Sequence, residues 1–186
     1  MKKKLLASAL IGIVIFFSYL FLRPKTRVLY SAHAAPSHYF GDKVISIVDG
    51  ATRVEVFRLK DHLLSNYYPL AKHKEAIDYA GKPQGKEFAS RLSDVLLKPT
   101  TYGIQNWACF SPGVAFRLWR NKQSATVLIC FHCNNLLLLD DAAKASDKKG
   151  YTQGISSEGR AALVQLVKEV LPDDAVIQSL SADVPK

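Results

Sequence analysis

The residues of this sequence that could do chemistry gather in one short segment, Cys130-Phe131-His132-Cys133, with a third cysteine at Cys109. A C-x-x-C pair can form a disulfide, act as a thiol redox couple or supply two thiolates to a metal ion. No G-x-S-x-G, P-loop, G-x-G-x-x-G or H-E-x-x-H motif is present. The sequence therefore offers no catalytic constellation besides this cysteine segment.

A structural disulfide is the first interpretation of the cysteines. If the segment from Cys130 to Cys133 is extended, the two Cα atoms lie about 10 Å apart at ~3.3 Å per residue, whereas a disulfide needs roughly 4.4–6.8 Å. With a polar hairpin turn at 120–124, the opposite strand brings Cys109 nearer to Cys133 than to Cys130. We therefore expect a Cys109–Cys133 disulfide in an oxidising compartment, with Cys130 as a buried thiol.

Three alternatives stay open beside that pairing. Cys130 and Cys133 could form a thioredoxin-like redox pair, with His132 lowering a thiol pKa, although the strands that such a fold needs do not follow. Zinc could be held by Cys109, Cys130, Cys133 and His132, although neighbouring residues rarely both reach one tetrahedral ion. The three cysteines could also be unlinked structural thiols.

The elements that position the cysteines follow from hydrophobic periodicity and turn residues. The predicted elements are strands at 44–48, 53–59, 77–79, 114–119, 125–131 and 136–139, and helices at 85–97 and 158–171. Asp49-Gly50 predicts the turn of a first hairpin, and 140–153 reads as a loop. Each helix has one apolar face, which must be buried against a sheet. The predicted fold class is therefore α+β, an antiparallel sheet of two hairpins with two helices on one face.

The first residues predict where the protein works. Three lysines precede 18 uncharged residues, 5–22, which is long enough to cross a bilayer as a helix. The run is longer than a typical signal-peptide core, so we favour an uncleaved anchor over a cleaved signal. We expect an anchor at 1–22, a linker at 23–40 and one extracytoplasmic domain at 41–186. Cleavage would instead give a secreted or periplasmic protein.

The net charge of +9 does not indicate a nucleic-acid partner. Six of the 25 basic residues flank the apolar run, which leaves 19 basic against 16 acidic residues, a net charge of +3. Charges beside an anchor can contact anionic lipid. No basic stripe with interleaved aromatic residues remains, so the expected partners are the membrane and an unknown protein or small molecule.

The second half of the chain carries a recognisable pattern. Its parts are Pro112-Gly113-Val114-Ala115-Phe116-Arg117-Leu118-Trp119, then Val127 to Asn134, then Ala161-Ala162-Leu163-Val164 with Lys168-Glu169 and Pro172-Asp173-Asp174. With these residues the chain resembles a family of uncharacterised, often exported bacterial proteins. The resemblance implies a shared domain around the cysteine hairpin, and it implies no activity.

Together these features favour a disulfide-stabilised, membrane-tethered binding or structural domain over an enzyme. The sequence predicts no catalytic residue, no metal site and no cofactor. The alternative function is thiol redox chemistry at Cys130 and Cys133, or a small zinc site at the same cysteines.

Overall fold

The computed structural model describes residues 36, 40–60, 76–104, 110–143 and 152–183. The predicted anchor at 5–22, most of the predicted linker and Cys109 lie outside the described residues. Among the residues described, no helix has both the length and the apolar composition that a bilayer span requires. Residues Ala32–Lys186 form one compact unit.

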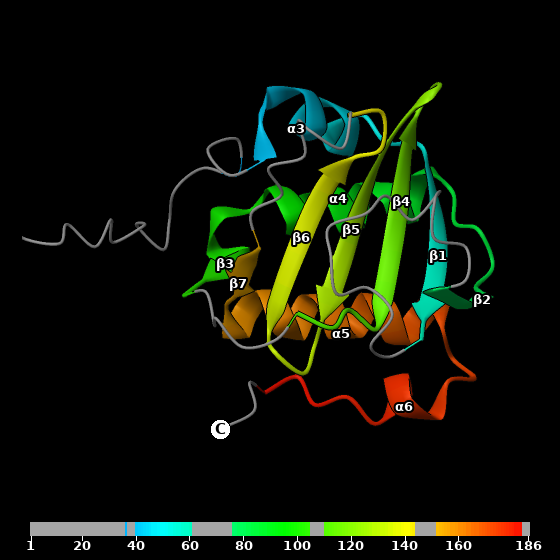
Figure 1. Cartoon of the computed structure of the whole chain (residues 1–186), viewed down its shortest axis with the longest axis vertical. Helices are drawn as coiled ribbons and strands as arrows, with labels where there is room; N and C mark the ends of the chain where they lie inside the picture. Colours follow the sequence, from blue (N-terminus) through cyan, green and yellow to red (C-terminus); the bar gives the residue numbers. More distant parts are fainter. Residues whose placement is uncertain (1–35, 37–39, 61–75, 105–109, 144–151, 184–186) are drawn as a thin grey trace, which may run out of the picture. The chain divides into compact units, whose positions relative to one another are not determined.

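The centre of this unit is an antiparallel sheet of seven strands in the order β2-β1-β4-β5-β6-β7-β3 (Figure 1). The strands are β1 (Arg53–Leu59), β2 (Ile77–Ala80), β3 (Tyr102–Gly103), β4 (Val114–Arg120), β5 (Gln123–Cys130), β6 (Asn135–Asp140) and β7 (Gln153–Ile155). The predicted α+β class with an antiparallel sheet is confirmed, but the sheet is larger than two hairpins. Strands β3 and β7 have three residues or fewer, too short for a periodic pattern.

Four α-helices are described, together with a 3₁₀ turn at Pro99–Thr101. The helices are α3 (Asp42–Asp49), α4 (Lys86–Leu97), α5 (Ser157–Val170) and α6 (Ala175–Gln178). The prediction of a strand at 44–48 is wrong, because α3 occupies these residues. The helix buries three residues at helical spacing, Val44, Ile47 and Val48. The same residues also fit the alternating pattern of a strand, but only the helix places all three against the core.

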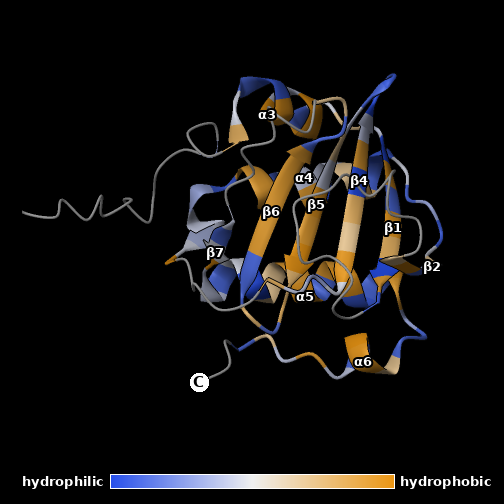
Figure 2. Cartoon of the chain, in the orientation of Figure 1, coloured by the Kyte–Doolittle hydropathy of each residue, from blue (hydrophilic) through white to orange (hydrophobic). Residues whose placement is uncertain are grey.

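The β4–β5 hairpin also differs from its predicted form. Arg120 pairs directly with Gln123, so the turn has two residues instead of the five predicted at 120–124. Asn121 has a positive φ of 55°, a conformation that asparagine tolerates better than most residues and that two-residue hairpin turns require. Figure 2 shows this hairpin tip in hydrophilic colours and most of the neighbouring strand β6 in hydrophobic ones.

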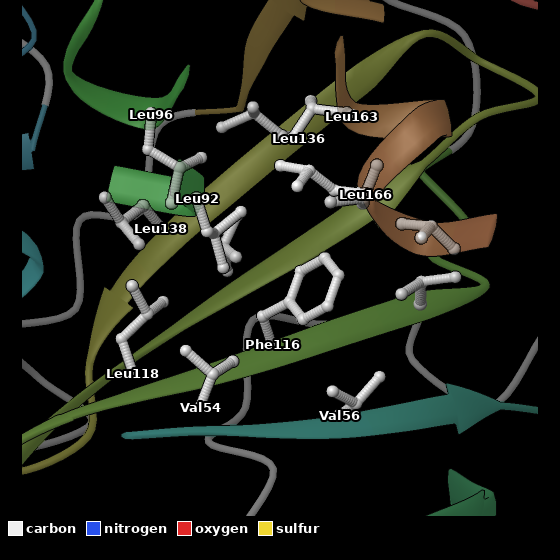
Figure 3. Packing of buried hydrophobic residues seen from close by; sticks show 14 of the residues in the cluster. Val54, Val56, Leu92, Leu96, Phe116, Leu118, Leu136, Leu138, Leu163 and Leu166 are labelled. Atoms are coloured by element: carbon white, nitrogen blue, oxygen red, sulfur yellow. The ribbon is translucent and has the colours of Figure 1, made fainter. Parts of the chain in front are cut away.

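The main core lies between one face of the sheet and helices α3, α4 and α5. Alternate strand residues such as Phe116 and Leu118 share this core with Leu92 of α4 and Leu163 of α5 (Figure 3). The opposite face carries a smaller apolar cluster, whose members are Leu59, Ala76, Ala115, Leu128, Leu137 and Leu139. Both faces of the central strands are therefore buried, and the cysteine segment lies where β5 turns into β6.

Candidate functional site

The predicted cysteine site is a closed turn between two strands. Strand β5 ends at Cys130, β6 begins at Asn135, and the residues between them form a turn. Cys130 and Cys133 are joined by a disulfide with a Cα–Cα distance of 5.6 Å. The expectation that this segment is extended is wrong, because the turn brings the two Cα atoms into disulfide range.

This bond bears on the predicted Cys109–Cys133 pairing, because it uses the same sulfur atom of Cys133. Cys109 lies outside the described residues. The Sγ atom of Cys133 is bonded to Cys130 in this structure and is not free to join Cys109. The pair that forms is therefore the one on which the redox alternative depends.

The two cysteines are shielded from solvent. Cys130 is 1% exposed and Cys133 is 2% exposed, whereas His132 between them is exposed. The backbone N–H of Cys133 donates to the Cys130 Sγ atom at 3.2 Å. Thiol–disulfide exchange requires that an attacking thiolate reach a sulfur atom along a clear path. Burial of both residues closes that path in the folded state.

A buried arginine supports the turn from beneath. Arg160 of α5 is 3% exposed, and its Nη1 group donates to the Phe131 carbonyl at 2.6 Å and to the Asn134 Oδ1 atom at 3.3 Å. Its guanidinium also lies 5.6 Å from the centre of the Phe131 ring. Burial lowers the pKa of the Arg160 guanidinium, and the negative charge of Asp183 opposes that shift. Arg160 therefore places a positive charge below the disulfide.

Arg160 did not emerge from the sequence as a site residue, although a signal existed. It precedes Leu163, Val164 and Val167 at helical spacing, so it falls on the apolar face of the predicted helix. A charged residue on a buried helix face needs polar partners in the interior. The partners are the carbonyls of Phe131 and Ser181 and the side-chain oxygen of Asn134, and only tertiary structure shows them.

The zinc alternative conflicts with the observed bond. Metal binding uses cysteine thiolates, and a disulfide offers none. Across the described parts of the chain, no three histidine, cysteine, aspartate or glutamate side chains gather as a metal site would require. Zinc at Cys130 and Cys133 would therefore need the reduced protein.

A second polar group, the charged strip, lies on the sheet face that α3, α4 and α5 do not cover. Its members are Arg53, Glu55, Arg117, Ser124, Thr126 and Asp141. Asp141 accepts hydrogen bonds from the Ser124 hydroxyl at 2.7 Å and from the Thr126 hydroxyl at 2.8 Å. Arg117 lies between Glu55 and Asp141, with N–O distances of 3.5 and 3.4 Å.

The charges in this strip alternate and compensate one another across the strands. Within the described residues, the buried Nε1 atom of Trp119 has no hydrogen-bond partner, and the buried Nε atom of Arg117 has the Asp141 ion pair without a hydrogen bond. The carboxylates on both sides of Arg117 disfavour an anionic ligand there. The strip therefore links β1, β4 and β5 through paired charges.

A third polar group joins α6 to the edge of the sheet. Arg58 Nε lies 3.0 Å from the Asp174 Oδ2 atom, and the Tyr79 hydroxyl donates to the same oxygen at 2.8 Å. Burial opposes ionisation of Asp174, but hydrogen bonds from the Ile177 amide and Tyr79 and the charge of Arg58 hold its pKa below the usual value. Burial and the Asp174 carboxylate raise the pKa of Tyr79 to about 12.

An open hollow of about 570 Å³ lies beside α3. Its lining residues are Pro36, Asp42, Ile45, Ser46, Asp49, Leu97 and Arg120. Arg120 donates to the Ser46 carbonyl at 2.8 Å, which ties the β4–β5 hairpin to α3. The lining carries no cysteine, histidine or other nucleophile beside a base, so this hollow has no catalytic constellation.

The chain matches no family model, no curated protein and no solved structure. The site must therefore be judged by its own geometry.

Proposed function

We propose that the protein is a membrane-tethered, extracytoplasmic module that binds a protein or small-molecule partner and uses its disulfide for structure. The burial of both bonded cysteines supports this proposal most directly, since a catalytic disulfide must be reached by its substrate. The 18-residue apolar run supports the location. A disulfide persists outside the cytoplasm and is rare within it, so the location and the bond support each other.

Thiol trapping in cells tests this function. Cells that express the full chain are quenched in acid with an alkylating reagent, fractionated and examined by mass spectrometry. We expect the membrane fraction to contain a Cys130–Cys133 disulfide and one alkylated thiol at Cys109. A mature chain in the cytosol with three alkylated cysteines would contradict the proposal.

A pair of substitutions in the apolar run tests the location, one that adds a charge and one that serves as its matched control. Val14→Glu should impair membrane insertion, because a charged residue at the centre of a bilayer helix costs several kcal/mol. Val14→Leu keeps the run apolar and should behave as the wild type. Protease added to spheroplasts should degrade the domain of the wild type and of Val14→Leu, and should spare Val14→Glu.

Thiol redox chemistry is the second candidate, because the structure joins the very pair that this function needs. The two candidates predict different exchange rates. A structural disulfide should react with glutathione no faster than the folded domain opens, whereas a redox disulfide should exchange directly. Reduction that is rapid, and equally rapid at every denaturant concentration below the unfolding transition, would favour the redox function.

A further inference from the structure

The residues around the disulfide form a connected set, which we call the cystine end. It consists of the turn at 131–134, β7, the first turns of α5 and residues 181–183. Arg160 joins three of these parts, because its donors reach the carbonyls of Phe131 and Ser181 and the side chain of Asn134. The Ser181 bond, from Nε, is 3.1 Å long.

Asn134 connects the same turn to β7. It has a positive φ of 52°, and its carbonyl accepts from the Ile155 N–H at 2.9 Å. Its side-chain amide donates to the Ile155 carbonyl at 2.5 Å. Strand β7 has three residues and also pairs with β6 and β3, so Asn134 adds to an attachment that is short on both sides. A change in the backbone conformation at Asn134 would weaken this attachment.

The cystine end contributes Phe131 and Ile155 to the main core, but most of the core lies elsewhere. Helices α3 and α4 pack on β1 and β4 through apolar side chains that are far from the cysteines in sequence. A change in the turn at 131–134 would therefore spread along polar contacts to β7, α5 and the C-terminal segment. It would leave the packing of α4 on the sheet in place.

We propose that the Cys130–Cys133 bond is a redox-dependent latch that locks the cystine end once the domain has left the cytoplasm. The dithiol form leaves the cystine end loose, and oxidation closes it as one unit. The proposed location supplies the change of compartment, so this inference rests on the proposed function.

The closing reaction balances as thiol–disulfide exchange with a disulfide-bearing partner. The thiolate of one cysteine attacks the partner disulfide, which forms a mixed disulfide and releases one partner thiolate. The thiolate of the second cysteine then displaces the other partner sulfur. Cys130 and Cys133 lose two electrons and two protons, and the partner gains both as two thiols. In the disulfide form both cysteines are buried, which hinders reopening, and closing requires that the looser dithiol form expose a sulfur to the partner.

Hydrogen exchange of the purified full chain tests the latch. Oxidised protein and protein reduced with a phosphine are compared by mass spectrometry, peptide by peptide. We expect amides at 131–137, 153–161 and 179–183 to exchange roughly 20- to 30-fold faster after reduction, since a cross-link that closes a very short loop constrains the open state by about this factor. Amides of α4 and β4 should keep their rates. Equal rates in both forms, or a uniform rise that includes α4 and β4, would overturn the proposal.

A substitution that leaves the disulfide intact tests the connection independently. Arg160→Lys keeps the charge but cannot reach three acceptors with a planar fork, so the oxidised variant should loosen the same peptides. Arg91→Lys, at an exposed position of α4, is the matched control and should change none of them. Unchanged exchange in oxidised Arg160→Lys would overturn the role of Arg160. Both measurements use purified protein and do not depend on the cellular location. The latch can therefore be disproved while the proposed location holds, and the location can be disproved while the latch holds.

Discussion

The main core and the cystine end hold their elements together in opposite ways. In the core, many apolar side chains from four helices and six strands share the packing, so no single contact determines the arrangement. In the cystine end, the disulfide closes the turn, Arg160 joins the turn to Ser181, and Asn134 joins it to the three-residue strand β7. We therefore expect the core to resist local changes and to fail as a whole, and the contacts of the cystine end to open first.

The largest expected effect comes from the core. Phe116 is fully buried and lies 5.9 Å from Phe88, measured between ring centres. Phe116→Ala should lower the free energy of unfolding by about 3–5 kcal/mol, because it removes apolar contacts and leaves a cavity. Urea unfolding followed by circular dichroism measures this loss. Val176→Ala, at a residue that is 58% exposed, should change stability by less than about 0.5 kcal/mol. Similar losses in both variants would contradict the importance of the core.

A smaller loss is expected at the polar centre of the cystine end. Arg160→Ala leaves the carbonyls of Phe131 and Ser181 without their donor. We expect the free energy of unfolding to fall by about 2–3 kcal/mol, the cost of unsatisfied buried groups. Arg91→Ala breaks an exposed ion pair with Glu169 and should cost at most about 1 kcal/mol. Urea unfolding of the two variants under identical conditions measures both losses. A larger loss of unfolding free energy in Arg91→Ala than in Arg160→Ala would contradict the comparison.

The sequence could predict most of the framework that separates these two regions. The apolar face of 85–97 and the alternation at 53–59 and 114–119 correspond to α4, β1 and β4, because these elements bury a periodic set of residues. Residues 44–48 fit both a strand and a helix, and only contact with the sheet decides between them. The prediction that Cys133 pairs with Cys109 assumes that residues 130–133 are extended. A tight turn follows β5 instead, and it brings Cys130 within bonding distance of Cys133. Arg160 and Asn134 act through carbonyls of distant residues, which no local pattern encodes.

The cysteines allow a test of which pairing stabilises the domain. Cys133→Ala breaks the observed bond and should lower the free energy of unfolding by about 2 kcal/mol, the chain-entropy value for a very short loop. Cys109→Ala should leave the oxidised melting curve unchanged if Cys133 is bonded to Cys130 alone. Calorimetry without reductant compares the two variants. A loss at Cys109→Ala that equals the loss at Cys133→Ala would restore the pairing expected from the sequence.

The smallest effect is expected at the polar group that joins α6 to the sheet, where alkaline titration follows a single hydroxyl. The pKa of Tyr79 is raised to about 12, so the folded state keeps the proton that the unfolded state loses near pH 10. The stabilisation from this hydroxyl is therefore complete below about pH 10 and is lost as the pH rises to about 12. Tyr79 is 39% exposed, and solvent screening keeps the change in free energy small.

Substitution of its partner separates burial from the carboxylate as the cause of this shift. Asp174→Asn removes the negative charge beside the Tyr79 hydroxyl and should bring the pKa of Tyr79 down towards 10, while burial keeps part of the shift. Asp173→Asn, at the exposed neighbouring residue, should leave the pKa of Tyr79 unchanged. Ultraviolet difference spectroscopy of the phenolate measures both variants, each against the same protein with Tyr79→Phe. If Asp174→Asn leaves the pKa of Tyr79 at about 12, burial alone holds the proton, and the polar contact adds nothing that the apolar packing does not already provide.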